Sequence, residues 1–194
     1  MNITPITPAF STINNTVAVA FTSSDYYAPY LSVVLLSLVK HSSINTNYDI
    51  VVFTKDISED NKTYLTNLIS SKNISLRFYN VNNIFNENKL FVPDYVSIET
   101  YFRIIAPEIF CEYPKVLFCD SDILIREDIK YLYNINIEGY PLAAAEELLV
   151  QSVFIRAKKD FISFLKTLGL NNPRRYFQAG ILLFNCKYFK KYNL

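Results

Sequence analysis

The sequence predicts an α/β protein built around a parallel, doubly wound sheet, and two observations carry this prediction. Short apolar runs alternate with amphipathic segments of helical period over residues 16–79, and the connections between them are short. This alternation is typical of a parallel sheet with helices packed against its faces. The composition agrees with a single globular domain, because 194 residues that are 51% hydrophobic and 19% charged can bury a sizeable core.

The first part of the chain gives strand, helix, strand, helix and strand in turn. Residues 16–22 and 48–54 are apolar runs that read as buried strands, and residues 74–79 supply a third. Pro29 fits the first turn of the first helix, and Ser58 precedes two acidic residues that open the second. The first helix has one apolar stripe: Leu31, Val34, Leu35, Leu38 and Val39.

A third helix is expected over residues 97–106, with Ser97 as its N-cap and Pro107 as its stop. Its buried stripe consists of Ile98, Tyr101, Phe102 and Ile105. Arg103 falls on the flank of this stripe. It is either a solvated surface charge or a planar donor that reaches a phosphate over the edge of the helix.

Two further strands are expected in the second half of the chain. Residues 142–147 read as a strand of small residues that delivers Glu146 and Glu147 at its end. The alternative is a helix start in which both acids complement the helix dipole. Residues 176–185 form the last strong strand, and Gly180 inside it indicates close approach of a ligand or of a neighbouring group.

Three short helical segments complete the chain. They are residues 128–133, residues 160–168 with Gly169 ending the helix, and the basic and aromatic residues 187–192. For the last of these, a membrane-surface role is the alternative to an exposed helix start.

Asp120 and Asp122 interrupt the apolar run of residues 116–125. In an extended chain these two side chains share a face about 6.6 Å apart, while Ser121 turns away. Such a pair suits Mg²⁺ or Mn²⁺ with a diphosphate as further ligand. The alternative is a strand that ends in a polar turn, with Asp122 as a cap. Because ligands bind at the carboxyl ends of parallel strands, the loop of residues 23–27 should share a crevice with the aspartates.

Charge and cysteine content restrict the class of protein. The formal net charge is only +1, so no broad basic surface for nucleic acid is indicated. Three cysteines without C-x-x-C spacing read as buried thiols in a reducing compartment, which predicts a cytoplasmic protein. No apolar run is long enough for a transmembrane segment, so membrane association would be peripheral, at the inner face. Residues 1–15 are expected to be a loosely ordered leader rather than a signal peptide.

Four segments together resemble glycosyltransferase family 8, which includes bacterial lipopolysaccharide galactosyl- and glucosyltransferases and glycogenin. They are F-T-S-S-D-Y-Y at residues 21–27, T-Y-F-R-I at 100–104, V-L-F-C-D-S-D at 116–122 and Y-F-Q-A-G-I-L-L-F-N at 176–185. The resemblance runs from about Val17 to the last residue. It implies a GT-A fold, in which a Rossmann-like, mostly parallel central sheet is flanked by helices.

The resemblance also implies an activity. The expected reaction is metal-dependent transfer of a hexose from a UDP-sugar to a glycan or lipopolysaccharide-type acceptor, with retention of anomeric configuration. Mn²⁺ is the implied cofactor, with Mg²⁺ as the alternative.

Site residues follow by position in the family's motifs. Asp120 and Asp122 resemble the metal-binding D-x-D pair, and Gln178 and Glu147 stand where the family contacts the reacting sugar. Gln178 replaces a common Asn, and the register of Glu147 against Glu146 is open. The implied donor-binding residues are Thr22, Ser24, Tyr26, Tyr27, Arg103, Asp120, Ser121, Asp122, Ala179 and Gly180.

The sequence lacks two motifs that the family has toward its C-terminus. The family's later D-Q-D-like segment and its metal-binding His are absent, so residues 16–194 are expected to be a nucleotide-sugar-binding domain that is C-terminally incomplete relative to the family. His41 reads as a helix cap or surface residue. Two alternatives stay open: a truncated, non-catalytic scaffold that binds nucleotide sugars, and an aspartyl-phosphate phosphatase, against which Leu124 and the mid-chain position of Asp120 argue.

Overall fold

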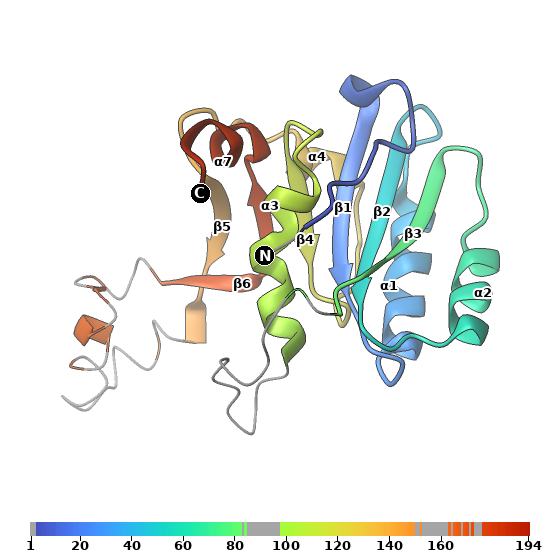
Figure 1. Ribbon diagram of the computed structural model, residues 1–194, viewed down its shortest axis with the longest axis horizontal. Helices are drawn as coiled ribbons and strands as arrows, with labels where there is room; N and C mark the ends of the chain where they lie inside the picture. The colour runs from blue at the N-terminus through green and yellow to red at the C-terminus, as the bar shows by residue number, and fades with distance from the viewer. Residues whose placement is uncertain are drawn as a thin grey trace.

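The computed structural model describes residues 3–82, 84, 98–149, 152, 163, 165–167, 169–170, 172 and 176–194. In this part of the chain six strands form one sheet in the order β3-β2-β1-β4-β6-β5 (Figure 1). The strands are β1 (Thr16–Thr22), β2 (Asn47–Thr54), β3 (Ile74–Asn80), β4 (Val116–Cys119), β5 (Leu142–Glu146) and β6 (Phe177–Phe184). Strands β1 to β4 pair in parallel, and β6 pairs antiparallel with both β4 and β5. The predicted mostly parallel α/β sheet is confirmed.

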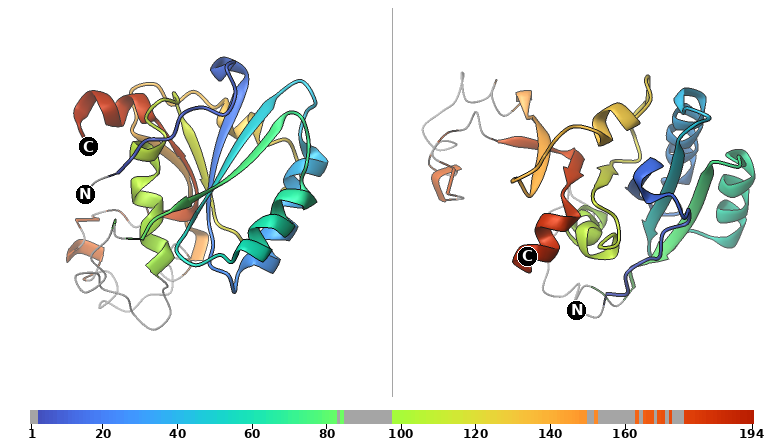
Figure 2. Two further views of the ribbon diagram at one scale, coloured as in Figure 1. Left: turned by 45° about the vertical axis from the view of Figure 1, so that its right-hand side comes forward. Right: turned by 90° about the horizontal axis from the view of Figure 1, so that it is seen from above.

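Helices cover both faces of this sheet. The described helices are η1 (Ile13–Asn15), α1 (Ala28–His41), α2 (Glu59–Leu68), η3 (Ile98–Ile105), α3 (Ala106–Ile109), α4 (Lys130–Tyr133) and α7 (Cys186–Tyr192). Helices α1 and α2 lie on one face of the sheet, along β1 to β3 (Figure 2). On the other face η3 contacts β1, and α3 contacts β4 and α7. Every residue of β1 and β4 is buried, as expected for central strands covered on both sides.

The helix expected to stop at Pro107 ends at Ile105, and a second helix that contains Pro107 follows at once. Pro107 lies in the first turn of α3, where its missing N–H is not needed for a helical hydrogen bond. The expected α-helix before it is instead the 3-10 helix η3, whose N-cap candidate Ser97 lies outside the described residues. Phe102 and Ile105 are buried as expected, whereas Ile98 and Tyr101 are only partly buried.

The N-terminal segment also differs from the expectation of a loosely ordered leader. The Ile6 N–H donates to the Ile109 carbonyl at 3.0 Å, and the Ala9 N–H donates to Asp49 Oδ2 at 3.0 Å. Arg77 Nη1 donates to the Thr7 carbonyl at 2.9 Å. The segment therefore crosses the sheet face at fixed positions, because the buried Asp49 on β2 and the partly buried Arg77 on β3 take partners from its backbone.

The other local expectations are largely borne out. Ser58 caps α2 by accepting from the Asn61 N–H, and residues 142–146 form a strand rather than a helix start. Gly169 has a positive φ of 77° after the helical residues 165–167, while much of the expected helix over residues 160–168 lies outside the described chain. None of the described helices combines the length and apolar character that a membrane span requires.

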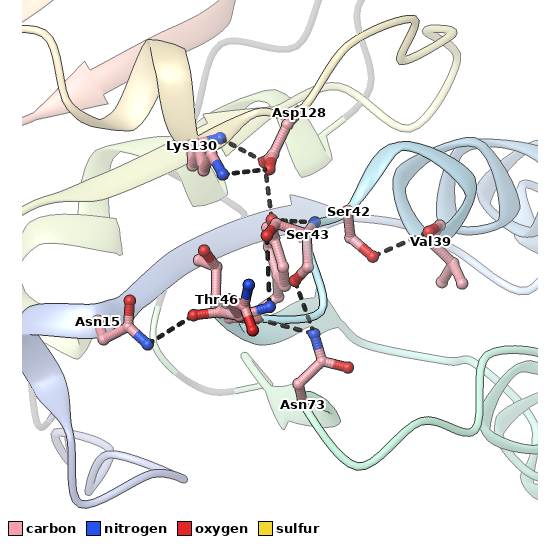
Figure 3. Close-up of polar contacts among 10 residues, drawn as sticks. Asn15, Val39, Ser42, Ser43, Thr46, Asn73, Asp128 and Lys130 are labelled. Carbon is pink, nitrogen blue, oxygen red and sulfur yellow. Dashed lines mark hydrogen bonds and ion pairs between the residues drawn. The ribbon is translucent and has the colours of Figure 1, made fainter.

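A polar network fixes the edge of the sheet at which β2 begins (Figure 3). Asn73 Nδ2 donates to the carbonyls of Ser43 and Thr46, at 3.1 and 2.8 Å. The fully buried Tyr48 receives the Ser43 N–H and donates its own O–H to Asp128 at 2.7 Å. Asp128 is therefore bound to β2 as well as to the start of α4, so the segment that follows the aspartate pair is anchored at its far end.

Candidate functional site

An open pocket of about 240 Å³ lies at the carboxyl ends of β1 and β4. The two strands are paired with Phe21 opposite Cys119, so they end at the same level and their following residues meet. Helix η3 supplies the remaining lining. The lining residues are Thr22, Ser23, Ser24, Tyr27, Glu99, Thr100, Arg103, Asp120, Ser121 and Asp122.

Asp120 is the most constrained carboxylate of the pocket. Its N–H donates to the Gly180 carbonyl at 2.7 Å, which fixes the backbone where β4 ends. Its Oδ1 accepts from Arg103 Nη2 at 3.2 Å, and 32% of its side chain is exposed. Burial raises the pKa of Asp120 and the charge of Asp122 adds to this, while Arg103 opposes both.

Arg103 is turned into the protein rather than solvated, since only 14% of its side chain is exposed. Its Nε donates to the Thr100 carbonyl at 2.8 Å, and its Nη1 donates to the Ala179 carbonyl. The guanidinium also lies over the Phe118 ring, 5.1 Å from its centroid. The reading of Arg103 as an ordinary surface charge is therefore wrong. In this structure it joins η3 to the ends of β4 and β6.

Gly180 makes the close approach that its place in a strand indicated. A Cβ built on Gly180 would overlap Asp120 Oδ2 and Gln178 Nε2, so only glycine leaves room for both side chains. Gln178 Oε1 accepts the Ile181 N–H at 3.0 Å, which turns the amide back along its own strand. The groups that approach Gly180 are thus the side chains of Asp120 and Gln178, two candidate site residues of this chain.

The loop after β1 is fastened to the loop after β2. Asp25 Oδ1 accepts from the Ser58 N–H and from Asn61 Nδ2, both at 2.8 Å. The Ser58 hydrogen bond is the main reason that the pKa of Asp25 lies below its ordinary value. On the other side of the loop, the Ser23 N–H donates to the Phe53 carbonyl. These contacts set the position of the hydroxyl groups that line the pocket.

The structure brings most of the expected donor-binding residues together. Thr22, Ser24, Tyr27, Arg103, Asp120, Ser121 and Asp122 all line the pocket. Ala179 and Gly180 adjoin it through their contacts with Arg103 and Asp120. Tyr26 does not line the pocket, because its side chain is 79% exposed and packs edge-on against Tyr27.

Glu147 also lies outside the pocket lining. Its N–H donates to the Tyr176 carbonyl at 3.0 Å, which continues the pairing of β5 with β6. Its carboxylate accepts the Leu149 N–H at 3.0 Å and so serves the turn that follows the strand. Glu146 is exposed.

Three pocket residues were not singled out from the sequence: Ser23, Glu99 and Thr100. Ser23 lies inside the loop that was expected to contribute. The position of Glu99, one turn before Arg103 on the same helix, was a usable signal, but the helical reading of this segment drew attention only to its apolar stripe.

The donor atoms fit a hard divalent cation that takes part of its coordination from a substrate. Asp120 and Asp122 present two carboxylates to the same pocket. Among the described residues, no group of three His, Cys, Asp or Glu side chains is close enough to hold a metal ion. Mg²⁺ and Mn²⁺ are commonly bound by one or two carboxylates, with phosphate oxygens and water as the other ligands. The pair suits that arrangement and not an all-protein cage.

Comparison with known proteins identifies the family. The sequence profile of glycosyl transferase family 8 matches residues 18–194. The chain belongs to glycosyl transferase family 8. One relative, a putative glycosyltransferase of Haemophilus influenzae, is 33% identical over 93% of this chain and 52% of its own length. The chain spans about half the length of the curated relatives that it matches.

Solved structures of glycosyltransferases share the fold. The apo structure of the WbbM bifunctional glycosyltransferase superposes with a TM-score of 0.84 at 33% identity, over 97% of this chain and 34% of that one. The galactosyltransferase LgtC, solved in complex with donor and acceptor sugar analogues, gives a TM-score of 0.71 at 25% identity, over 90% and 60%. The fold is GT-A, as the resemblance in sequence implied.

Proposed function

We propose that this chain binds the donor in a metal-dependent glycosyltransferase, which moves a hexose from a UDP-sugar to a glycan or lipopolysaccharide-type acceptor with retention. The observation that carries the proposal is the pocket itself. It gathers Asp120, Asp122 and Arg103 at the shared carboxyl ends of two parallel strands, where α/β sheets bind their ligands. Family membership adds the class of reaction.

The charge of the pocket supports a divalent cation. Three carboxylates, those of Glu99, Asp120 and Asp122, face one guanidinium, that of Arg103, so the lining has a formal charge of −2. A diphosphate would add further negative charge to this site. Mn²⁺ or Mg²⁺ held by Asp120 and Asp122 would supply Lewis-acid stabilisation of the leaving diphosphate.

The chain's own residues have separate tasks in this proposal. The loop after β1 binds the nucleoside through Thr22, Ser24 and Tyr27, and its anchorage by Asp25 keeps that surface in place before the donor arrives. Arg103 keeps Asp120 in position and places a positive charge beside the departing diphosphate. Preorganised charge of this kind stabilises a transition state without reorganisation during the reaction.

The sugar would lie toward β6, because Ala179 and Gly180 adjoin Asp120 from that side. Gln178 flanks Gly180 and is assigned to orienting the sugar in an oxocarbenium-like transition state. Glu147 is assigned the same task, which requires its carboxylate to leave the Leu149 N–H. We place the reaction in the cytoplasm, with peripheral association at the inner face of the membrane as the alternative to a free protein. The three free thiols support a reducing compartment.

Ligand-dependent thermal stability tests the proposal. A ligand that binds only the folded state raises the melting temperature with its concentration. UDP-, GDP- and CMP-sugars are screened with Mn²⁺, with Mg²⁺ and with EDTA, and stabilisation should need UDP and metal together. Equal responses to all three nucleotides, or a UDP response unchanged by EDTA, would contradict the proposal.

Release of UDP from UDP-galactose and UDP-glucose then separates catalysis from binding. Metal-dependent release supports the transferase, whereas binding without release supports a non-catalytic scaffold. The phosphatase alternative predicts a response to phosphate analogues with Mg²⁺ and no nucleotide, and it has lost its basis because the chain belongs to a glycosyltransferase family.

A further inference from the structure

Glu99 lines the pocket and adds to its negative charge, but the proposal above gives it no contact with the donor. It does not complete the metal site, because the described residues contain no group of three acidic, His or Cys side chains suited to one ion. It is not the ion-pair partner of Arg103, which forms its salt bridge with Asp120. A half-buried carboxylate therefore faces a pocket that is already acidic.

The backbone of Glu99 on η3 is offset from that of Arg103. Arg103, four residues later, reaches Asp120, and four residues of a 3-10 helix cover roughly 8 Å along the axis. The Thr100 carbonyl between them accepts from Arg103 Nε. Glu99 thus enters the pocket from a point on η3 that precedes the residue assigned to the diphosphate.

The chemistry of a carboxylate restricts what Glu99 can contact. An ionised carboxylate accepts hydrogen bonds and donates none, so it repels phosphate oxygens and requires a donor from the ligand. The neutral part of a nucleoside diphosphate offers such donors, namely the ribose hydroxyls and the base N–H. The uncharged lining residues of the pocket carry hydroxyl groups, among them Tyr27 with its ring, and these suit the same neutral part.

We infer that Glu99 accepts a hydrogen bond from the nucleoside of the donor, through either a ribose O–H or the base N–H, and thereby selects the nucleotide. The inference rests on the proposed function. A ligand that lacks the donor group would leave a desolvated carboxylate without a partner, which is the arrangement that discriminates most strongly between related ligands. Glu99 is then a specificity-determining residue that acts on the nucleoside and not on the leaving group.

A double-mutant cycle between protein and ligand tests this assignment. Dissociation constants of UDP, 2′-deoxy-UDP, 3′-deoxy-UDP and N3-methyl-UDP are measured by calorimetry with Mn²⁺ for the parent and for Glu99→Ala. In the parent, one analogue should bind at least about tenfold more weakly than UDP, as expected for the loss of a charge-assisted hydrogen bond. In Glu99→Ala the same analogue and UDP should differ less than about threefold. The analogue that shows this coupling identifies the donor group.

Two controls separate recognition from a structural role. Glu99→Gln keeps the size of the side chain and should weaken UDP binding less than Glu99→Ala, because its amide oxygen still accepts. Glu108→Gln removes one exposed carboxylate from the neighbouring α3 and should leave every dissociation constant unchanged. Pyrophosphate with Mn²⁺, which lacks a nucleoside, should bind the parent and Glu99→Ala equally well or the variant more tightly.

The outcomes that overturn the inference differ from those that overturn the proposed function. A parent that fails to bind UDP with Mn²⁺ removes both. A parent that binds UDP, with analogue penalties unchanged in Glu99→Ala, removes the role of Glu99 alone. Loss of pyrophosphate binding in both Glu99 variants would assign Glu99 to the structure of the pocket, and this also overturns the inference.

Discussion

Asp120 is placed by two neighbours that lie far from it in the sequence, Arg103 and Gly180. The Gly180 carbonyl holds its backbone, Arg103 holds one carboxylate oxygen, and the missing side chain of Gly180 leaves room for the other. Because burial raises the pKa of Asp120, the folded protein binds its proton more tightly than the unfolded chain does. Ionised Asp120 therefore lowers the free energy of unfolding at neutral pH. Such a cost is expected of a carboxylate whose role is to bind a ligand and not to stabilise the fold.

The variants Asp120→Asn and Asp122→Asn should both lose metal-dependent UDP binding. Each removes one of two carboxylates, so the loss should exceed the roughly 10–100-fold caused by changes outside the coordination sphere. The apoprotein should be as stable as the parent or more stable with Asp120→Asn. The stabilising effect of protonated Asp120 is present below its unfolded pKa and is lost as pH rises through the higher folded pKa, and Asn avoids this loss. Exposed Asp122 should change stability by less than about 0.5 kcal/mol.

Calorimetry with Mn²⁺ and UDP and thermal melts in EDTA measure these two effects separately. Melting temperatures of the metal-free protein that fall by many degrees in both variants would instead support the reading of a polar turn capped by Asp122.

Gly180→Ala should damage the site through packing alone. The added methyl group would overlap the ends of the Asp120 and Gln178 side chains. These can turn away, so the free energy of unfolding should fall by only about 0.5–1.5 kcal/mol, the cost of a side chain forced off its preferred rotamer. Metal-dependent UDP binding should fall with it, because Asp120 is moved away from Arg103. Ala145→Ser adds one atom at an exposed position of the neighbouring β5 and is the matched control. Parent-like UDP affinity in Gly180→Ala would show that the site tolerates a shifted Asp120.

At the level of elements, Asp25 connects the pocket loop to the start of α2 by hydrogen bonds. Its charge should stabilise the folded protein only above its folded pKa. The folded pKa lies below the ordinary value of 3.8, so the stabilisation is fully present above that value and is lost as pH falls through the folded pKa. Asp25→Asn should therefore melt below the parent at pH 7, and this difference should shrink as the pH falls through the folded pKa of Asp25. A difference in melting temperature that stays the same over an acid titration would mean that the ionised form has no special role.

How far an element could be predicted depended on whether its determinants are local. The apolar runs of β1, β2 and β4 and the Ser58 cap of α2 are determined by adjacent residues, and the structure has them where the sequence placed them. The D-x-D pair was singled out by a period of two along an extended chain. In the structure β4 ends at Cys119 and a turn follows, so Ser121 lines the pocket together with both aspartates instead of turning away. Pro107 was misread because a proline within a helical pattern can end one helix or begin the next, and the local sequence fits both.

Features that depend on residues distant in the sequence could not be predicted from local patterns. The N-terminal segment is held by Asp49, Arg77 and Ile109, which no pattern within the segment reveals. The inward orientation of Arg103 likewise depends on Ala179 and Asp120, on two other strands. Glu99 precedes Arg103 by four residues on the same helix, but its place in the pocket also depends on η3 lying beside β1.

At the level of the whole molecule, one buried carboxylate holds four segments together. Asp49 on β2 is 0% exposed and accepts from Arg77 on β3 through Nε at 3.1 Å and Nη2 at 2.6 Å. It also accepts from the Tyr113 hydroxyl, in the segment after α3, and from the Ala9 N–H. Burial and this carboxylate raise the pKa of Tyr113, so the hydroxyl stays protonated and serves as a donor. The network lies near the beginning of β2, away from the strand ends that form the pocket.

Arg77→Met should be among the most destabilising changes in the protein. It leaves Asp49 buried without its cation, which typically costs about 3–5 kcal/mol and corresponds to a melting temperature lower by roughly 6–20 °C in a domain of this size. The double variant Asp49→Leu with Arg77→Met should recover much of that loss, because no unpaired charge remains. Both should bind UDP with parent affinity at temperatures where they are folded. Additive losses in the double variant would show that the segments depend on the hydrogen bonds of Asp49, including the one to the N-terminal backbone, more than on its charge.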